Sequence, residues 1–518
     1  MKKYILLLTL LSSGALYAQV PEDALRYSWF PQNGTARNLA IGGAMGSLGG
    51  DINATFVNPA GLGFYKTGEF VFSPGFTMNK NKADYRDTRT QQNKNAFSMG
   101  PIGVVLGGSD QYSKKSGALS IAFTQVANFN NEIRYKGLNN LSSFSEQFAE
   151  EFAKANADPR LRYSIDDVLN SNSPLPYGSA PALYTYLIDT VRVNGVLQVK
   201  AAPEYILDAG QALMQEMYKK TTGGLYEAAL GIALNQKDKW FFGGTIGMPL
   251  VNYNSHTTFN EYDTSQSTTN QFQSFEYQDY LETKGVGVNL KLGAIYRPQE
   301  YIRIGLALHT PSFMWLTDTR HTTLLTRLEP PQDEPYIASE TFTGGSPGKN
   351  KYMQMSPWRA ILSASYVFRE VENVKRQRAF ISADVEYINH GGSRFYNVSE
   401  DGTLEKDYYK GLNEVVKQQY KGTVNFRVGG ELKFNTIMGR LGFAYYGRPY
   451  KEAALKASQM LLSGGLGYRN KGFFIDLTYI HHINKDVDFP YRLEDRQNTY
   501  AVVKQQQGNI AATVGFKF

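Results

Sequence analysis

The feature that most constrains this chain is a strict alternation of apolar and polar side chains over long segments. In the last twelve residues, 507–518, apolar side chains occupy the even positions and small or polar ones most of the odd positions. The segments 301–309, 381–387 and 426–434 repeat the pattern. Because a period of two places successive side chains on opposite faces of a β-strand, the pattern predicts strands with one apolar face.

Strands of this kind occur in soluble β-sandwiches and in transmembrane barrels, and three features favour the barrel. The predicted strands span ~10–14 residues, whereas soluble strands average ~5–6. Their second face is rich in Gly, Ser and Thr with charges of both signs, as a water-filled lumen requires. Aromatic residues gather near strand ends, as in interfacial girdles: Phe473, Phe474, Tyr479, Phe516 and Phe518. After the first twenty residues no apolar run approaches the ~18 needed for a spanning helix.

The number of strands and the lengths of their connections give a second test. We place fourteen strands near 68–79, 94–108, 116–128, 223–236, 239–253, 281–297, 301–317, 352–369, 378–391, 423–435, 439–447, 458–470, 472–484 and 507–518. Short connections follow even-numbered strands, at 237–238, 298–300, 435–438 and 470–471. Long connections follow most odd-numbered strands, at 80–93, 129–222, 254–280, 318–351, 392–422 and 485–506. Short periplasmic turns and long outer loops produce this asymmetry, so we predict an all-β, 14-stranded antiparallel transmembrane barrel.

The first residues predict export. Met1-Lys2-Lys3 is basic, residues 4–11 are apolar, and Ala15-Leu16-Tyr17-Ala18 offers a cleavage point, so residues 1–18 form a predicted signal peptide. The chain has no Cys, which excludes a disulfide scaffold and a thiol nucleophile. Its net charge of +7 comes without a basic run and gives no reason to expect nucleic acid. We therefore expect an exported protein of the Gram-negative outer membrane.

The longest connection, about 129–222, is too long to lack structure of its own. Ser143 and Glu146 have capping-box spacing, and Phe144, Phe148 and Phe152 recur at helical spacing. A second helix is predicted around Ile206, Leu213, Met214 and Met217. Two interpretations remain open: an apolar capture surface at the cell exterior, or two helices that pack on each other and cap the barrel.

Residues 19–67, before the first strand, do not alternate and are rich in glycine. They contain no GxxxxGK[ST] motif, so a phosphate cradle is not indicated. About fourteen strands leave a lumen wider than their own side chains fill. Some fifty residues suffice for a compact plug, in which glycines permit tight folding and Pro59 fixes a turn.

Within this segment, Asp51 to Leu62, including Asn58-Pro59-Ala60, resembles the hatch of the FadL/TodX family of outer-membrane transporters for hydrophobic compounds. Further similar positions are Gly285-x-x-x-Asn289, Tyr296-x-Pro298, Gly305 and Pro311. The resemblance implies a hatch at 19–67, a barrel at 68–518, and a moving element at Asn58, Pro59, Ala60 and Gly61. It also implies passive uptake of long-chain fatty acids or similar molecules by a monomer among outer-membrane lipids. No ATP, cofactor, metal or catalytic residue is then expected.

A fatty acid would need an apolar pocket and a cation for its carboxylate, since each buried CH₂ contributes ~0.8 kcal/mol but the anion needs a charged partner. The cations at strand positions whose side chains should face the lumen are Lys291, Arg303, Arg359, Arg427 and Lys433. The alternative is that each pairs with a lumen carboxylate, such as Asp384, Glu386 or Glu431.

Three other functions compete with transport of apolar molecules. A passive hemin-binding receptor would use histidines such as His256, in or near an outer loop, or His481-His482 at a strand end. An energy-coupled receptor needs ~22 strands, more than this chain supplies. An outer-membrane hydrolase needs a paired Ser/His/Asp-type set, and no GxSxG occurs. A structural or adhesive barrel would not need a glycine-rich hatch.

Overall fold

The structure is a computed structural model that describes residues 21–110, 115–193, 196–265, 267, 269–329, 334–368, 378–399, 402–405, 408–453, 455, 457–494, 496 and 498–518. The predicted signal peptide, 1–18, lies outside the described residues. Across the described helices, none is both long enough and apolar enough to cross a membrane.

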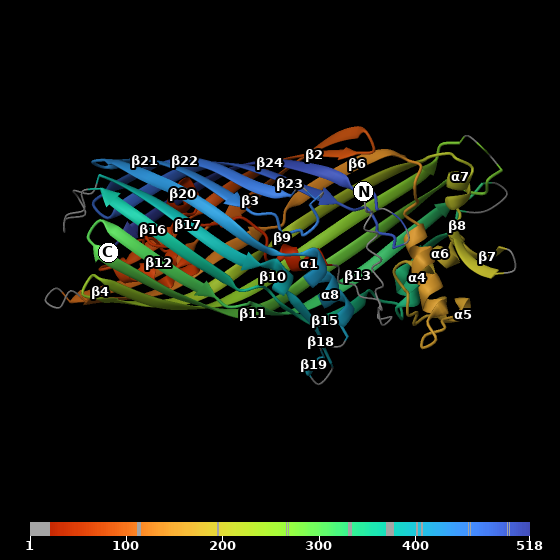
Figure 1. The fold of residues 1–518 in the computed structure, drawn as a ribbon, viewed down its shortest axis with the longest axis horizontal. Coiled ribbons are helices and arrows are strands. Elements are labelled where there is room, and N and C mark those ends of the chain that lie inside the picture. The colour runs from red at the N-terminus through yellow and green to blue at the C-terminus, as the bar shows by residue number, and fades with distance from the viewer. Residues whose placement is uncertain are drawn as a thin grey trace, which may run out of the picture.

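The described chain forms a closed antiparallel barrel of fourteen strands (Figure 1), in agreement with the predicted count and fold class. Eight barrel strands are continuous: β9 (Leu213–Gln236), β10 (Trp240–Asp263), β11 (Ser274–Gln299), β20 (Gly422–Phe434), β21 (Ile437–Tyr446), β22 (Ser458–Asn470), β23 (Phe473–Asp488) and β24 (Ala501–Lys517).

The other six barrel strands are each interrupted once. They are β1 (Glu69–Phe72) with β2 (Pro74–Tyr85), β3 (Thr88–Met99) with β4 (Ile102–Asp110), β5 (Lys115–Asn128) with β6 (Asn131–Asn139), β12 (Ile302–His309) with β13 (Phe313–Arg327), β15 (Gly348–Met355) with β16 (Arg359–Phe368), and β17 (Ala379–Asn389) with β18 (Arg394–Val398). The last strand, β24, pairs with β1 and β2 and so closes the ring.

The faces of the wall follow the predicted alternation. Apolar side chains such as Ile510, Leu441 and Leu466 point outward and are 42%, 75% and 65% exposed. Between them, Thr513 and Ser463 point inward and are buried. Such exposure would be unfavourable in water but suits contact with lipid, so the wall has the polarity of a membrane barrel.

Barrel strands are longer than the sequence predicts, and two predicted loops are wrong. Strands β10 and β11 continue into the predicted loop 254–280 and leave only 264–273 between them. The predicted loop 80–93 is a hairpin whose turn residues, Arg86 and Asp87, have φ of 46° and 61°. These extensions carry polar residues on both faces, so no alternation reveals them. The short turn at Lys237-Asp238, with φ of 55° and 54°, lies where predicted.

Residues 21–67, here called the lumen segment, pack against the inner wall. They contain α1 (Asp23–Arg26), α2 (Ala36–Ala40), α3 (Ala54–Val57) and the 3₁₀ helix η1 (Pro59–Phe64). Inward-facing glycines allow a close approach: a Cβ on Gly442 would lie 2.1 Å from Gly42 N, and one on Gly293 would lie 1.9 Å from Asn58 Oδ1. The lumen segment therefore fits into the wall at positions where any larger side chain would displace it.

The remaining elements belong to the loops at the opposite end from the short turns, called the loop end. These are α4 (Glu146–Ala157), α5 (Ile165–Val168), α6 (Ser179–Tyr184), β7 (Ile188–Val193), β8 (Val196–Ala201), α7 (Glu204–Asp208), β14 (Tyr336–Ala338), η2 (Ser339–Phe342), β19 (Leu404–Glu405) and α8 (Lys410–Gln419). The 3₁₀ helix η4 (His390–Gly392) instead forms the interruption between β17 and β18 in the wall. The largest group, residues 140–212, forms a cap.

Candidate ligand site in the barrel lumen

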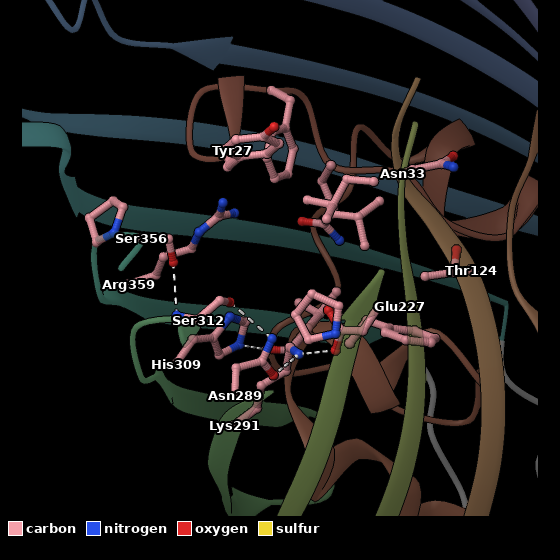
Figure 2. A pocket seen from close by; sticks show the side chains of 18 of the residues that line it. Tyr27, Asn33, Thr124, Glu227, Asn289, Lys291, His309, Ser312, Ser356 and Arg359 are labelled. Carbon is pink, nitrogen blue, oxygen red and sulfur yellow. Dashed lines mark hydrogen bonds and ion pairs between the residues drawn. The ribbon is translucent and has the colours of Figure 1, made fainter. Parts of the chain in front are cut away.

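A pocket lies between the lumen segment and the inner wall (Figure 2). Its empty volume is about 950 Å³, including the open mouth. The lumen segment contributes Tyr27, Phe30, Phe56 and Val57, and the wall adds further apolar side chains such as Leu225, Met314 and Ile361. The apolar side chains, together with polar groups held at fixed places, are the kind of lining that a small-molecule site has.

On one side of the pocket, Lys291 is already paired. Its Nζ contacts Glu227 Oε1 and donates to Asn289 Oδ1 at 2.8 Å, and both charged side chains are 7% exposed. Asn289 Nδ2 in turn donates to Ser312 Oγ at 3.0 Å. Because Glu227 neutralises Lys291 inside the site, this pair confirms the alternative interpretation for Lys291 and supplies a polar wall.

Arg427 also has carboxylate partners. Its guanidinium lies 3.3 Å from Glu386 Oε2 and 3.8 Å from Asp384 Oδ2, and it is 1% exposed. These are two of the lumen carboxylates expected as partners. The third, Glu431, pairs with Arg440 at 2.6 Å.

Arg359 differs from the other cations of the pocket. Its Nη2 donates to Ser28 O at 3.4 Å, and its guanidinium carbon lies 5.0 Å from the ring centre of Phe30. Within the described residues no carboxylate lies within 4.0 Å of it. Arg359 is therefore a half-buried cation at the pocket that no carboxylate contacts directly, although Glu386, which pairs with Arg427, interacts with its charge over a longer distance.

The last two predicted cations lie outside the pocket lining. Arg303 Nη1 donates to Leu48 O at 2.7 Å, and the guanidinium lies 4.7 Å from the ring centre of Phe64. Arg303 therefore holds the lumen segment. Lys433 lies two residues before the turn at Asn435, at the short-turn end. Of the five predicted cations, the fold brings Lys291, Arg359 and Arg427 together.

The predicted moving element, Asn58 to Gly61, lies directly beside the pocket. Asn58 Nδ2 donates to Gly46 O at 2.6 Å, and its Oδ1 accepts from Ala60 N at 3.2 Å. The same Nδ2 lies 3.4 Å from two wall carbonyls, those of Ala294 and Leu306. Pro59, Ala60 and Gly61 are buried in the first turn of η1. Asn58 therefore ties the turn to the lumen segment and to the wall, directly after the pocket residues Phe56 and Val57.

The wall has a seam next to the pocket. In the described part of the chain β3 and β6 share no backbone ladder, although each pairs with its other neighbour. Side chains bridge them instead: Gln92 Nε2 donates to Glu132 Oε1 at 2.6 Å. At the lower end of the seam Asn33 Nδ2 donates to Met99 O at 2.9 Å and to Gln125 O at 2.6 Å. The lumen segment thus bonds to both sides of the seam.

Several residues that line the pocket were not predicted from the sequence, because only cations, and not their partners, were considered as candidates. Glu227 has inward parity on a strand that was correctly predicted, so a search for inward carboxylates would have found it. His309, whose Nε2 lies 2.9 Å from Val57 O, also had lumen parity. Tyr27 and Asn33 lie in a segment without periodicity, and nothing in the sequence indicates that they reach the pocket.

The histidines considered for hemin are placed differently from the prediction. His256 is in β10 rather than in a loop, and its ring stacks on Tyr280 at 4.1 Å. His481 and His482 lie inside β23, which continues to Asp488. Among the described residues no three His, Cys, Asp or Glu side chains form a group that could hold a metal ion.

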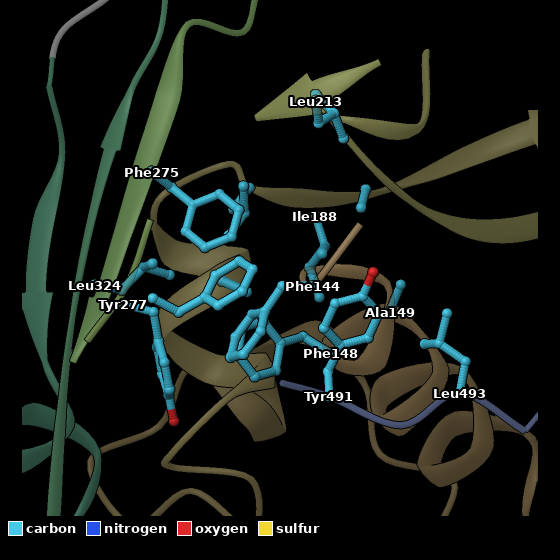
Figure 3. Close-up of a cluster of buried hydrophobic side chains, with 14 of the residues drawn as sticks. Phe144, Phe148, Ala149, Ile188, Leu213, Phe275, Tyr277, Leu324, Tyr491 and Leu493 are labelled. Carbon is cyan, nitrogen blue, oxygen red and sulfur yellow. The ribbon is translucent and has the colours of Figure 1, made fainter. Parts of the chain in front are cut away.

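The cap at the loop end was the other candidate for ligand capture, and Figure 3 shows its aromatic cluster. Phe144 stacks on Phe259 with ring centres 4.2 Å apart, and Phe144, Phe148 and Phe152 are 5%, 5% and 2% exposed. These side chains pack against strands β10 and β11 and are not a capture surface. They anchor the cap on the barrel.

Two details of the predicted cap need correction. The excursion is 140–212 rather than 129–222, because β6 and β9 extend into it. Of the predicted second helix only Ile206 is helical, in α7, while Leu213, Met214 and Met217 begin β9. Their spacing fits a strand with Leu213 and Met217 inward as well as it fits a helix. The predicted capping box is half formed: Ser143 N donates to Glu146 Oε1 at 2.6 Å, but the Ser143 hydroxyl bonds Ser145 and Glu261.

We expect the cap to loosen as the pH rises. Burial raises the pKa of Glu146 to about 7, although Arg496 lies 2.9 Å away and favours the charged form. The folded cap thus holds a proton that the unfolded chain releases near its ordinary pKa of 4.5, so stability is greatest below that pKa and falls as the pH rises towards 7. Hydrogen exchange of residues 146–157, corrected for intrinsic rates, should quicken severalfold between pH 5 and pH 8. Glu146→Gln should weaken the dependence, and the remainder should come from Glu151 and Glu204, whose pKa values burial also raises. An unchanged dependence in that variant would contradict the assignment.

The architecture defines the class of protein: a β-barrel of the outer-membrane kind, with fourteen strands and its N-terminal segment in the lumen. Its fold is that of the FadL/TodX barrels, as the hatch-like sequence indicates. A Pseudomonas aeruginosa FadL homologue superposes with a TM-score of 0.52 at 14% identity, covering 93% of this chain and 98% of the other. The P. putida toluene transporter TodX gives 0.52 at 13% identity, covering 94% and 99%. The chain matches no protein-family model and no curated protein sequence.

Proposed function

We propose that this protein imports long-chain fatty acids or similar hydrophobic molecules passively across the outer membrane. The observation that carries the proposal is the lumen pocket, which joins apolar side chains to one cation, Arg359, that no carboxylate among the described residues contacts directly. An amphiphile with one carboxylate matches that combination, because its chain gains from burial and its charge gains from the guanidinium. The FadL homologue and the toluene transporter that share the fold support a hydrophobic ligand.

In this proposal residues 19–67 act as the hatch. Ligand passes the cap at the loop end, occupies the pocket, and leaves when the hatch shifts. The seam between β3 and β6 offers a sideways path into the membrane, and release of Asn33 from Met99 O and Gln125 O would uncover it. No energy source is needed, because partition into the membrane drives the ligand downhill. One chain suffices, since its own strands close the ring.

Uptake of labelled oleate by cells that express or lack the protein tests the proposal. Expression should raise the initial rate severalfold. The variant Asn58→Ser/Pro59→Gly/Ala60→Ser should lower it towards the level without protein, because the turn that positions Phe56 and Val57 is lost. Heat-modifiable migration in gels shows whether the variant barrel is folded. Equal uptake with and without the protein would reject transport of fatty acids.

A further inference from the structure

Cations gather on the outside of the barrel wall where β2, β23 and β24 lie side by side (Figure 1). Lys82 is directly opposite Lys504, and Lys504 is directly opposite Lys485. The alternation of buried and accessible side chains directs all three outward, since Ala83 and Val503 beside them are buried. Three lysines thus form a row across three adjacent strands.

Two further cations, Lys80 and Arg89, complete a patch of five with the row. Among the described residues on the outward faces of β2, β3, β23 and β24, the carboxylate beside this patch is Asp84. Asp84 contacts Lys504 at 3.4 Å and Arg89 at 2.5 Å. Like charges directly opposite each other in a sheet repel, so the row destabilises the wall unless an anion lies between the ammonium groups. We call Lys80, Lys82, Lys485, Lys504 and Arg89 the lysine patch.

Cations on the outer faces of β6, β9 and β11 lie beside carboxylates: Lys136 is directly opposite Glu216, and Lys220 is directly opposite Glu132. Arg134 Nε donates to Glu216 Oε1 at 2.7 Å, and Lys284 Nζ lies 2.6 Å from Glu282 Oε1. The lysine patch differs from these one-to-one pairs, because four of its positive charges have no matching carboxylate on the described outward faces of β2, β3, β23 and β24.

The position of the lysine patch along the barrel axis indicates what kind of molecule would carry an anion bound there. Along β23 the outward side chain before Lys485 is Ile483, and along β2 the one before Lys80 is Met78; both are 37% exposed. The cations therefore begin where the apolar band ends, at the loop end of the barrel. An anion there is held by a molecule whose apolar part lies against the band.

We propose that the lysine patch binds the phosphorylated headgroup of a glycolipid in the outer leaflet, with its acyl chains against the apolar wall below. Adjacent strands lie about 4.8 Å apart, so the row spans roughly 10 Å, enough for two phosphate groups on one sugar headgroup. Each basic residue near an anionic membrane surface contributes to attraction, and several neighbouring ones make it specific for multiply charged lipid. This site lies outside the lumen and is independent of what the barrel transports.

Native mass spectrometry of the detergent-purified protein with bisphosphorylated lipid A tests the proposal. Wild-type protein should retain the lipid, and Lys82→Gln/Lys485→Gln/Lys504→Gln should retain it at least about tenfold less. The matched control Lys136→Gln/Lys220→Gln/Lys284→Gln removes the same charge from β6, β9 and β11, across the seam from β3, where carboxylates lie beside the lysines, and it should bind as wild type. Lys82→Arg/Lys485→Arg/Lys504→Arg keeps the charge and should retain the lipid, which separates lost binding from lost folding.

Two competitor arms distinguish the lipid from other anions. Inorganic phosphate at equal concentration should not displace lipid A from the wild-type protein. Dephosphorylated lipid A should bind the wild-type protein about as weakly as bisphosphorylated lipid A binds the Lys82→Gln/Lys485→Gln/Lys504→Gln variant. Equal binding by both triple-glutamine variants, displacement by free phosphate, or equal retention of phosphatidylglycerol would each overturn the proposal. Oleate uptake reports on the lumen alone, so failure here is separable from failure of the proposed transport.

Discussion

A disulfide bond between residues 55 and 120 is expected to stop transport. Thr55 of the lumen segment and Ser120 of β5 approach with hydroxyl oxygens 2.8 Å apart, and both side chains are buried. The chain has no cysteine, so Thr55→Cys/Ser120→Cys introduces one unambiguous pair. If the lumen segment must shift for ligand to pass, the oxidised variant should take up oleate at less than about a tenth of the wild-type rate, because a bond within normal disulfide geometry cannot stretch to follow the motion.

The comparison that makes this result decisive is a bond within the wall. Ser116 of β5 and Asn235 of β9 are directly opposite in register, and Asn235 Nδ2 donates to Ser116 Oγ at 3.0 Å. The oxidised variant Ser116→Cys/Asn235→Cys carries the same chemistry without a covalent bond to the lumen segment. It removes one hydrogen bond to that segment, from Ser116 Oγ to Gly63 O, and it should still transport normally. Reduction should restore uptake in the first variant. Full uptake with the 55–120 bond quantitatively formed would show that ligand passes a stationary lumen segment.

The lumen segment is joined to the wall by many separate contacts. Gly293 and Gly442 allow the segment to lie within contact distance of the wall backbone, and Asn58 bonds to groups on both. In the proposed shift of the segment such contacts would be lost together, so many small interactions rather than a single bond would hold it in the observed position. Ligand binding among Phe30, Phe56 and Val57 contacts the same segment, and it is therefore placed to bias the two states.

The barrel was predictable because each membrane-facing strand must keep one face apolar. That requirement gave the fourteen strands, their pairing order and the short turns. This requirement ends where the wall leaves the lipid. There the sequence pattern did not predict the part of β10 after Tyr253, and it placed Met217 in a helix. The lumen segment has no periodicity, because it packs against wall glycines on several sides, so only its resemblance to known hatches indicated its place.

The cations that line the pocket were predictable in part for the same reason. The alternation along the strands predicted that Lys291, Arg359 and Arg427 face the lumen. It does not predict which of them pairs with a carboxylate, because the pairing depends on side chains of strands that lie two or more strands away in the sequence. Glu227 neutralises Lys291 from an adjacent part of the wall. Only the three-dimensional arrangement distinguishes Arg359 from the others.

Arg359→Gln is therefore expected to change which ligands bind. A hydrogen bond to a charged group contributes about 1.5–3 kcal/mol, so oleate affinity should fall roughly 10- to 100-fold. Oleyl alcohol has the same chain without the charge and should bind the variant within about twofold of wild type. Intrinsic-fluorescence or calorimetric titration of the detergent-purified protein measures both. The matched control is Lys433→Gln, a lumen cation outside the pocket lining, which should alter neither affinity.

The pair of ligands separates three roles for Arg359. A loss confined to oleate assigns the guanidinium to the carboxylate, and Arg359→Lys should then recover part of the affinity, because a point charge replaces a planar fork. Equal losses for oleate and oleyl alcohol would mean that Arg359 shapes the pocket through Ser28 and Phe30. Unchanged affinity for both would remove the reason to favour a fatty acid over a neutral hydrocarbon. Binding measurements on the Arg359 variants therefore decide whether the pocket prefers a fatty acid or a neutral hydrocarbon.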